Sequence, residues 1–222
     1  MDIELFLEKM FQVVLYMSIV PIGVGIYCWT YLSWPLRIFW LSLVVGLLIS
    51  LIGDYLMAKH INNHVMFYVN TATDAVLMTA FFSAFMHSPF LQKFYQGLCV
   101  GLLFFMGWGI WTWGSSLNTA LRLSSIESCV VISMALLVLT NQLRQSTAVS
   151  LRRQPVVYIV VGVLVLNLFT LLLNLFGSQL YTYSARLFNL FYDTLAPLSN
   201  LLSYIFTCIG FWQSRSRALP LG

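Results

Sequence analysis

Residues 186–212 read RLFNLFYDTLAPLSNLLSYIFTCIGFW, a stretch long and apolar enough to cross a bilayer as one helix. Polar residues and a proline recur in it every three or four positions and so share one helical face: Arg186, Asn189, Asp193, Pro197, Asn200 and Tyr204. A carboxylate inside a membrane is costly, and such residues usually face the interior of a helix bundle. The stretch therefore predicts a membrane-spanning helix whose polar face is covered by other helices.

The composition of the whole chain is typical of a multi-pass membrane protein. Of its 222 residues, 60% are hydrophobic and 8% are charged, whereas a soluble domain carries about 25% charged residues. The apolar runs predict an all-α protein with a single domain over residues 1–222. We expect a seven-transmembrane-helix bundle with spans at about 11–31, 37–58, 64–87, 97–113, 121–141, 156–177 and 185–212.

The distribution of basic residues predicts the orientation of the chain. An odd number of spans places the two termini on opposite sides of the membrane. Four basic residues fall on the N-terminal side (Lys9, Lys59, Arg122 and Arg186), and seven fall on the other side (Arg37, Lys93, Arg144, Arg152, Arg153, Arg215 and Arg217). Because basic loops favour the cytoplasm, we expect the N-terminus outside and the C-terminus inside. The basic residues are spread over several loops, which does not favour a nucleic-acid partner.

Short matching segments indicate an internal repeat. The sequence VVGLL at 44–48 in the second span is similar to VVGVL at 160–164 in the sixth. An asparagine is followed four residues later by an aspartate in both the third and the seventh span, at Asn70 and Asp74 and at Asn189 and Asp193. Matching features in matching order suggest two parallel halves of three helices joined by the fourth, a 3+1+3 plan known from transporters.

Acidic and polar side chains inside the spans converge on the predicted outer half of the bundle, where no lysine or arginine lies at comparable depth. They predict an outward-opening pocket for a small polar or cationic ligand, and the candidate binding residues are Asp54, Asn70, Asp74, Glu127, Asn167, Asn189, Tyr192, Asp193 and Asn200. For the asparagines, the alternative interpretation is hydrogen bonding that holds helices together.

The two matching aspartates carry a more specific expectation. Because Asp74 and Asp193 share the same offset from Asn70 and Asn189, we expect the two carboxylates to lie within one side-chain contact across the bundle. A pair that close would hold a proton or a cation between them.

Motifs of metal and hydrolytic enzymes are missing from the sequence. Three scattered histidines do not form a zinc-binding pattern, and neither G-x-S-x-G nor H-E-x-x-H occurs. We therefore expect no metal site and no cofactor. Gly97 and Gly101 permit close approach of helices, within the protein or between subunits, so that a homo-oligomer is one expected partner besides the lipid bilayer.

The whole chain resembles an uncharacterised family of small bacterial seven-helix membrane proteins. The resemblance rests on NN at 62–63, SIE at 125–127 and IGFW at 209–212. It implies a multi-pass protein of the bacterial inner membrane, without implying an activity.

Asp74 and Asp193 resemble the counter-ion carboxylates on the third and seventh helices of microbial rhodopsins, and Asp193-x-x-Ala196 is similar to part of their seventh helix. The retinal-binding lysine of those proteins should follow next, but Pro197 stands there. None of the lysines in the sequence lies deep in a span: Lys9, Lys59 and Lys93. A retinal Schiff base is therefore excluded on chemical grounds.

Two further local resemblances imply different activities. Asn70 and Asn189 on a 3+1+3 plan resemble the small sugar transporters that carry an asparagine on helices 3 and 7, although spans 2, 5 and 6 lack the internal proline of that family. The segment SLIGD at 50–54 resembles the Gly-Asp element of the lysoplasmalogenase membrane hydrolases. The histidine expected about two dozen residues later is missing, because His60 and His64 come too early and His87 too late.

Three functions are consistent with these features. A membrane carrier for a small polar solute or cation is the favoured interpretation, because it explains acidic residues inside the spans and suits a repeat. The alternatives are a receptor-like sensor that signals through a partner protein and a lysoplasmalogenase-like hydrolase. An enzyme is thus the less favoured class.

Overall fold

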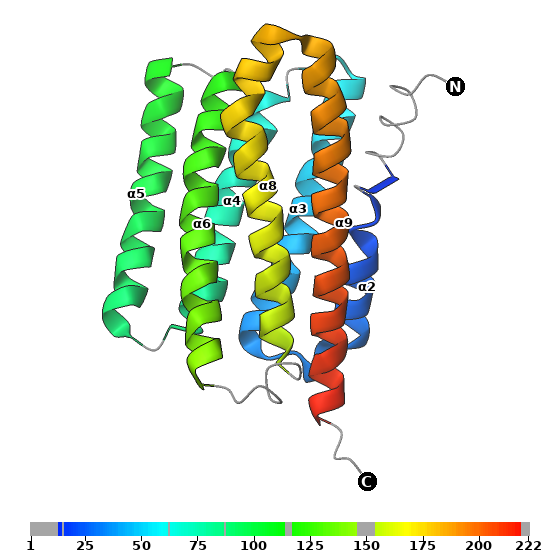
Figure 1. The fold of residues 1–222 in the computed structure, drawn as a ribbon, viewed down its shortest axis with the longest axis vertical. Coiled ribbons are helices and arrows are strands. Elements are labelled where there is room, and N and C mark those ends of the chain that lie inside the picture. The colour runs from blue at the N-terminus through cyan, green and yellow to red at the C-terminus, as the bar shows by residue number, and fades with distance from the viewer. Residues whose placement is uncertain are drawn as a thin grey trace.

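The computed structural model describes residues 13–14, 16–61, 63–86, 88–113, 117–145 and 154–218. This part of the chain contains seven α-helices and one 3-10 turn, which lie side by side in a single bundle (Figure 1): α2 (Ile19–Tyr27), η1 (Trp29–Tyr31), α3 (Trp34–Ala58), α4 (His64–Ser83), α5 (Pro89–Trp113), α6 (Leu117–Gln145), α8 (Pro155–Tyr183) and α9 (Ala185–Ala218). The prediction of an all-α fold is confirmed.

Six helices in the described ranges are long and apolar enough to cross a membrane: Trp34–Ala58, Val65–Ser83, Pro89–Thr112, Thr119–Arg144, Pro155–Gly177 and Arg186–Ser216. They correspond to the second through seventh predicted spans and indicate a multi-pass membrane protein. Most extend beyond the predicted limits, as α5 does by beginning at Pro89. Polar residues such as Gln92 and Lys93 interrupt the apolar sequence ahead of the predicted span, yet they lie within the helix.

The first predicted span, 11–31, corresponds to the nine-residue helix α2 followed by η1. Pro21 lies in the first turn of α2, where a backbone N–H is not required for the helical ladder. Residues 11, 12 and 15 of this span lie outside the described part of the chain, so a seventh crossing stays a prediction.

The order of helices in the bundle differs from their order in the chain. Helix α8 packs against α6 and α9, α4 packs against α3, α5 and α6, and α2 packs against α9. Helix α5 lies at one edge of the bundle (Figure 1). The approach of α8 to α9 depends on glycines, because a Cβ atom on Gly162 would lie 3.1 Å from the Ser203 carbonyl oxygen and one on Gly210 would lie 2.6 Å from Cγ1 of Ile159.

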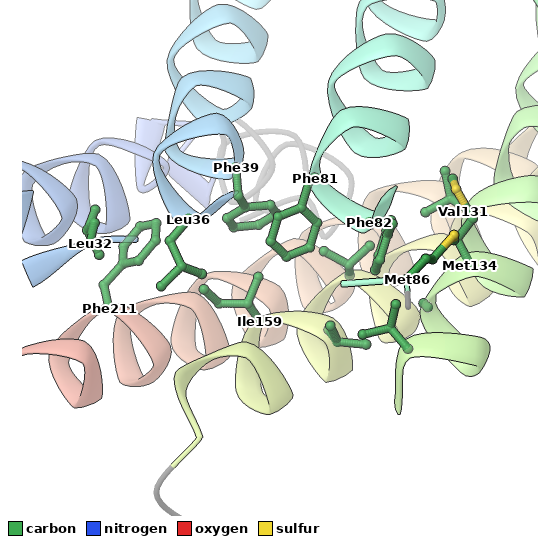
Figure 2. Packing of buried hydrophobic residues seen from close by; sticks show 14 of the residues in the cluster. Leu32, Leu36, Phe39, Phe81, Phe82, Met86, Val131, Met134, Ile159 and Phe211 are labelled. Atoms are coloured by element: carbon green, nitrogen blue, oxygen red, sulfur yellow. The ribbon is translucent and has the colours of Figure 1, made fainter. Parts of the chain in front are cut away.

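One half of the bundle is filled by apolar side chains. Figure 2 shows the aromatic rings of Phe39 and Phe81 side by side at the centre of this packing, with ring centroids 5.2 Å apart. Phe211 approaches Phe39 from α9, with centroids 6.2 Å apart. The buried members form what we call the hydrophobic cluster: Cys28, Leu32, Leu36, Phe39, Phe81, Phe82, Met86, Tyr95, Val131, Met134, Ala135, Val138, Ile159, Val160, Val163 and Phe211.

The hydrophobic cluster occupies the end of the bundle at which α3 and α8 begin and α4, α6 and α9 end. Its side chains come from helices that are distant in sequence, so the cluster connects the N-terminal helices of the bundle to the C-terminal ones. The opposite half of the bundle, toward the beginning of α4, α6 and α9, contains the polar residues described next.

Candidate functional site

A cavity of about 370 Å³ lies between helices α3, α4, α6, α8 and α9. This volume falls within the range of about 300–1,000 Å³ that is usual for small-molecule sites. Each of the five helices contributes polar side chains to the wall: Ser42 and Ser50; Asn70, Thr71 and Asp74; Ser124 and Glu127; Asn167, Thr170 and Asn174; and Tyr192, Ser199, Asn200, Ser203 and Tyr204.

Helical periodicity explains how each helix contributes one face to this wall. On α3 the lining positions include Ser42, Gly46 and Ser50, which are four residues apart and therefore lie on one side of the helix. A Cβ atom on Gly46 would have no other heavy atom within 4 Å. The absence of a side chain at Gly46 thus leaves part of the space that the cavity occupies.

Two carboxyl groups from different helices lie in the cavity wall. Asp74 on α4 is half-buried, and Glu127 on α6 is only 7% exposed. Both side chains line the same cavity, from two helices that pack against each other. Asn70 donates a hydrogen bond of 3.3 Å from Nδ2 to Oδ2 of Asp74. No lysine, arginine or histidine is among the described residues of the lining, so the wall carries acidic groups without a basic counterpart.

The other asparagines in the wall are held by hydrogen bonds to the protein. Nδ2 of Asn167 donates to the Val163 carbonyl at 2.9 Å, and Nδ2 of Asn200 donates to the Ala196 carbonyl at 2.8 Å. Each of these bonds uses one N–H, while an amide offers two donors and a carbonyl oxygen. These side chains are therefore oriented by their own helices and keep capacity for further hydrogen bonds.

A hydrogen bond between helices also fixes the wall. Nδ2 of Asn174 on α8 donates to Oγ of Ser124 on α6 at 3.1 Å. This contact corresponds to the alternative interpretation of the asparagines as groups that join helices. Asn174 therefore combines a packing contact with a position in the lining.

The structure brings six of the nine candidate residues into the lining: Asn70, Asp74, Glu127, Asn167, Tyr192 and Asn200. The other three are not among the lining residues. Asp54 lies near the end of α3 and is half-buried, Asn189 is exposed near the beginning of α9, and Asp193 is half-buried one position after Tyr192.

Asp193 is not among the residues of the cavity wall, so the expected contact between Asp74 and Asp193 stays a prediction. The acidic neighbour of Asp74 in the wall is Glu127, not Asp193. Consecutive residues of an α-helix differ by about 100° around its axis, so that Tyr192 and Asp193 point in clearly different directions. The wall on α9 follows Tyr192, Ala196, Ser199 and Ser203, which are spaced by four, three and four residues.

That spacing is also the signal for residues that the prediction omitted. Ser199 and Ser203 share a helical face with Tyr192, and both are buried. A small hydroxyl side chain in an apolar helix is weaker evidence for a binding site than a carboxylate, because the hydroxyl readily bonds to its own backbone. Ser199 does so, donating from Oγ to the Ala196 carbonyl at 2.9 Å.

Comparison of the chain with protein-family models, curated proteins and solved structures gives no match. The local resemblances to transporters, rhodopsins and hydrolases are therefore not extended by these comparisons. Within the described ranges, no group of three or more histidine, cysteine, aspartate or glutamate side chains is placed to hold a metal ion. The chemistry of the cavity is that of hydrogen-bonding side chains and two carboxyl groups on an otherwise apolar wall.

Proposed function

We propose that this protein is a membrane carrier that binds a small polar solute or cation in the cavity between α3, α4, α6, α8 and α9. The observation that supports this most is the position of the cavity, which lies inside a bundle of membrane-spanning helices and is lined by polar groups from five of them. Carboxylates at membrane depth are costly and are typical of solute and ion pathways.

The distribution of polar and apolar side chains supports an arrangement that opens to one side. The hydrophobic cluster lies at one end of the bundle, and the cavity extends from it toward the other end, with Phe39 and Val163 belonging to both. In a carrier, the packing between Phe39, Phe81 and Phe211 would close the pathway at the end of the cluster and would have to separate during transport. The cavity would then open on the side at which α4, α6 and α9 begin.

We assign that open side to the exterior. At the opposite end, the Arg37 guanidinium lies 5.0 Å from the centroid of the Trp29 ring, and the Arg215 guanidinium lies 4.8 Å from that of Tyr27. Arginines among aromatic rings are usual at a membrane interface, and the basic excess at this end favours the cytoplasm. The N-out, C-in orientation and the location in a bacterial inner membrane belong to this proposal.

Cysteine labelling tests the orientation. Tyr183, which is 86% exposed near the end of α8, and Leu143, which is 52% exposed near the end of α6, lie at opposite ends of the bundle. A membrane-impermeant maleimide should label Tyr183→Cys in intact cells and should label Leu143→Cys only after permeabilisation, with the wild-type protein as background. The reverse pattern would invert the proposed direction of opening.

Uptake into proteoliposomes tests the carrier function. The protein should accelerate entry of at least one solute from a defined mixture of amines, amino acids, sugars and inorganic cations, measured by mass spectrometry of the vesicle contents against protein-free vesicles. If no solute that the purified protein binds enters proteoliposomes faster than protein-free vesicles, the protein is not a carrier. The receptor-like alternative would then remain.

A further inference from the structure

We propose that the ligand of the cavity is a small organic cation, with an ammonium group held between Asp74 and Glu127 and an apolar body against the remaining wall. This inference rests on the proposed binding role of the cavity and names the class of solute. It is carried by the position of two carboxyl groups from different helices in one wall and by the absence of a basic side chain among the described lining residues.

Glu127 is the residue that points most directly to a missing cationic partner. It is only 7% exposed and lies in the lining. Within the described part of the chain, it takes part in no hydrogen bond or ion pair, and the other ionised side chain of the same wall is also an acid, Asp74. Buried charges in proteins are normally paired, because removing a charge from water is costly without a counter-charge. A bound cation would supply that counter-charge.

The hydrogen-bonding groups near the acids suit an ammonium head. A primary ammonium group has three N–H donors and no acceptor. Carboxyl oxygens of Asp74 and Glu127 and the side-chain oxygens of Asn70 and Ser124 are acceptors on the neighbouring faces of α4 and α6. Asn70 already donates to Asp74 and thereby orients that carboxylate within the wall. An anionic ligand would meet the same acids without a basic residue to balance them.

The size and the apolar part of the wall favour an organic cation over a bare metal ion. The cavity of about 370 Å³ is far larger than the space of about 30 Å³ that one water molecule takes in the liquid. Metal ions such as Mg²⁺ and Ca²⁺ need about six or more oxygen ligands at short distances, and the described residues offer no group of three metal-ligating acidic, histidine or cysteine side chains.

Aromatic and aliphatic side chains in the same wall provide a surface for the body of the ligand. Phe39 and Leu43 contribute from α3, Phe67 and Met78 from α4, and Leu166 from α8. Aromatic rings attract organic cations through the negative faces of their π-systems in addition to packing against apolar groups. The ligand class is therefore an amine with a hydrocarbon body, rather than a sugar or an inorganic ion.

Binding of 2-phenylethylammonium to the full-length protein in lipid nanodiscs tests the proposal. Calorimetry should show saturable binding that is absent from empty nanodiscs, and binding of the neutral analogue 2-phenylethanol should be weaker by about tenfold or more, because it lacks the charge that the acids recognise. Potassium chloride in excess should displace the amine no more than sodium chloride does at the same concentration.

Variants locate the site. Glu127→Gln and Asp74→Asn should each weaken the binding of 2-phenylethylammonium by about tenfold or more. Asp54→Asn is the matched control, because Asp54 is a half-buried acid on α3 that is not among the lining residues; it should leave the affinity within about twofold. If either lining variant fails to fold, the other variant and the comparison of amine with alcohol in the wild-type protein still decide.

Three results would overturn the proposal: no saturable binding of the amine, equal affinity for the alcohol, or unchanged affinity in folded Glu127→Gln and Asp74→Asn proteins. Uptake of a neutral solute by proteoliposomes, together with no binding of the amine, would refute this ligand class while leaving the carrier function intact. Binding of the amine without uptake of any bound solute would refute the carrier function while leaving this ligand class intact.

Discussion

Gly46→Leu is expected to abolish ligand binding and solute uptake without lowering the melting temperature. A Cβ atom at this position meets no heavy atom within 4 Å, so the leucine side chain can extend into the cavity without displacing a neighbouring helix. Leucine is also a better helix former than glycine by about 0.8 kcal/mol, which favours an unchanged or higher stability. Uptake into proteoliposomes and thermal unfolding in one detergent measure the two effects.

Gly107→Leu is the matched control for this change. A Cβ atom on Gly107 likewise has no heavy atom within 4 Å, but this glycine is exposed on α5 and is not among the cavity residues. The same gain in helix propensity should therefore appear without a loss of binding. If both variants retain binding, the cavity at Gly46 is not where the solute lies.

Phe81→Ala should produce a large loss of stability, of about 3–5 kcal/mol for a buried phenylalanine replaced by alanine. Phe81 is 0% exposed, and its ring centroid lies 5.2 Å from that of Phe39, 4.9 Å from that of Phe82 and 5.3 Å from that of Phe85. Removing the ring leaves a space that these neighbours cannot fill, so their packing contacts are lost.

Phe104→Ala provides the control, since Phe104 is 81% exposed on α5 at the edge of the bundle. The same atoms are deleted there without opening a space in the protein. Denaturant unfolding in one detergent should separate the two variants clearly. Similar losses of stability in both variants would mean that the packing around Phe81 does not hold the helices of the bundle together.

The helices were accessible from the sequence because membrane helices must satisfy their backbone hydrogen bonds internally and need about 20 apolar residues. Charged and amide residues in such segments, including Asp74 and Glu127, were recognisable as candidates because their burial is costly. That Asp74 and Glu127 line the same cavity could not be predicted from the sequence. The pattern on one helix gives the face on which a residue lies, but it does not state that α4 packs against α6.

The prediction for α9 shows a second limit. The sequence favours Asp193 because of its offset from Asn189 and because a buried acid should face inward, yet the cavity face follows Tyr192 and the small residues in phase with it. The predicted stripe and the cavity face both follow spacings of three and four and are offset by one residue, so the spacing alone does not decide between the two faces. Small residues such as Ser203 define the open face better, because they leave room for a ligand.

The repeat also illustrates how similar segments can have different surroundings. Gly46 faces the open cavity, whereas a Cβ atom on Gly162 would lie 3.1 Å from the Ser203 carbonyl oxygen and from Cβ of Phe206. One glycine leaves space for a ligand, and the other permits close packing of α8 and α9. A parallel 3+1+3 relationship between the two halves therefore stays a prediction from the sequence, because similar residues at the two positions do not perform the same structural role.

The most direct test of the cationic binding site is a crystal structure of the protein with 2-(4-bromophenyl)ethylammonium, using the anomalous signal of bromine to locate the ligand. The bromine should lie in the cavity between α3, α4, α6, α8 and α9, with the ammonium nitrogen within hydrogen-bond distance of Asp74 or Glu127. A bromine signal only elsewhere, for example in the apolar groove between α5 and α6 that is lined by Phe94, Gly97 and Ile126, would contradict it.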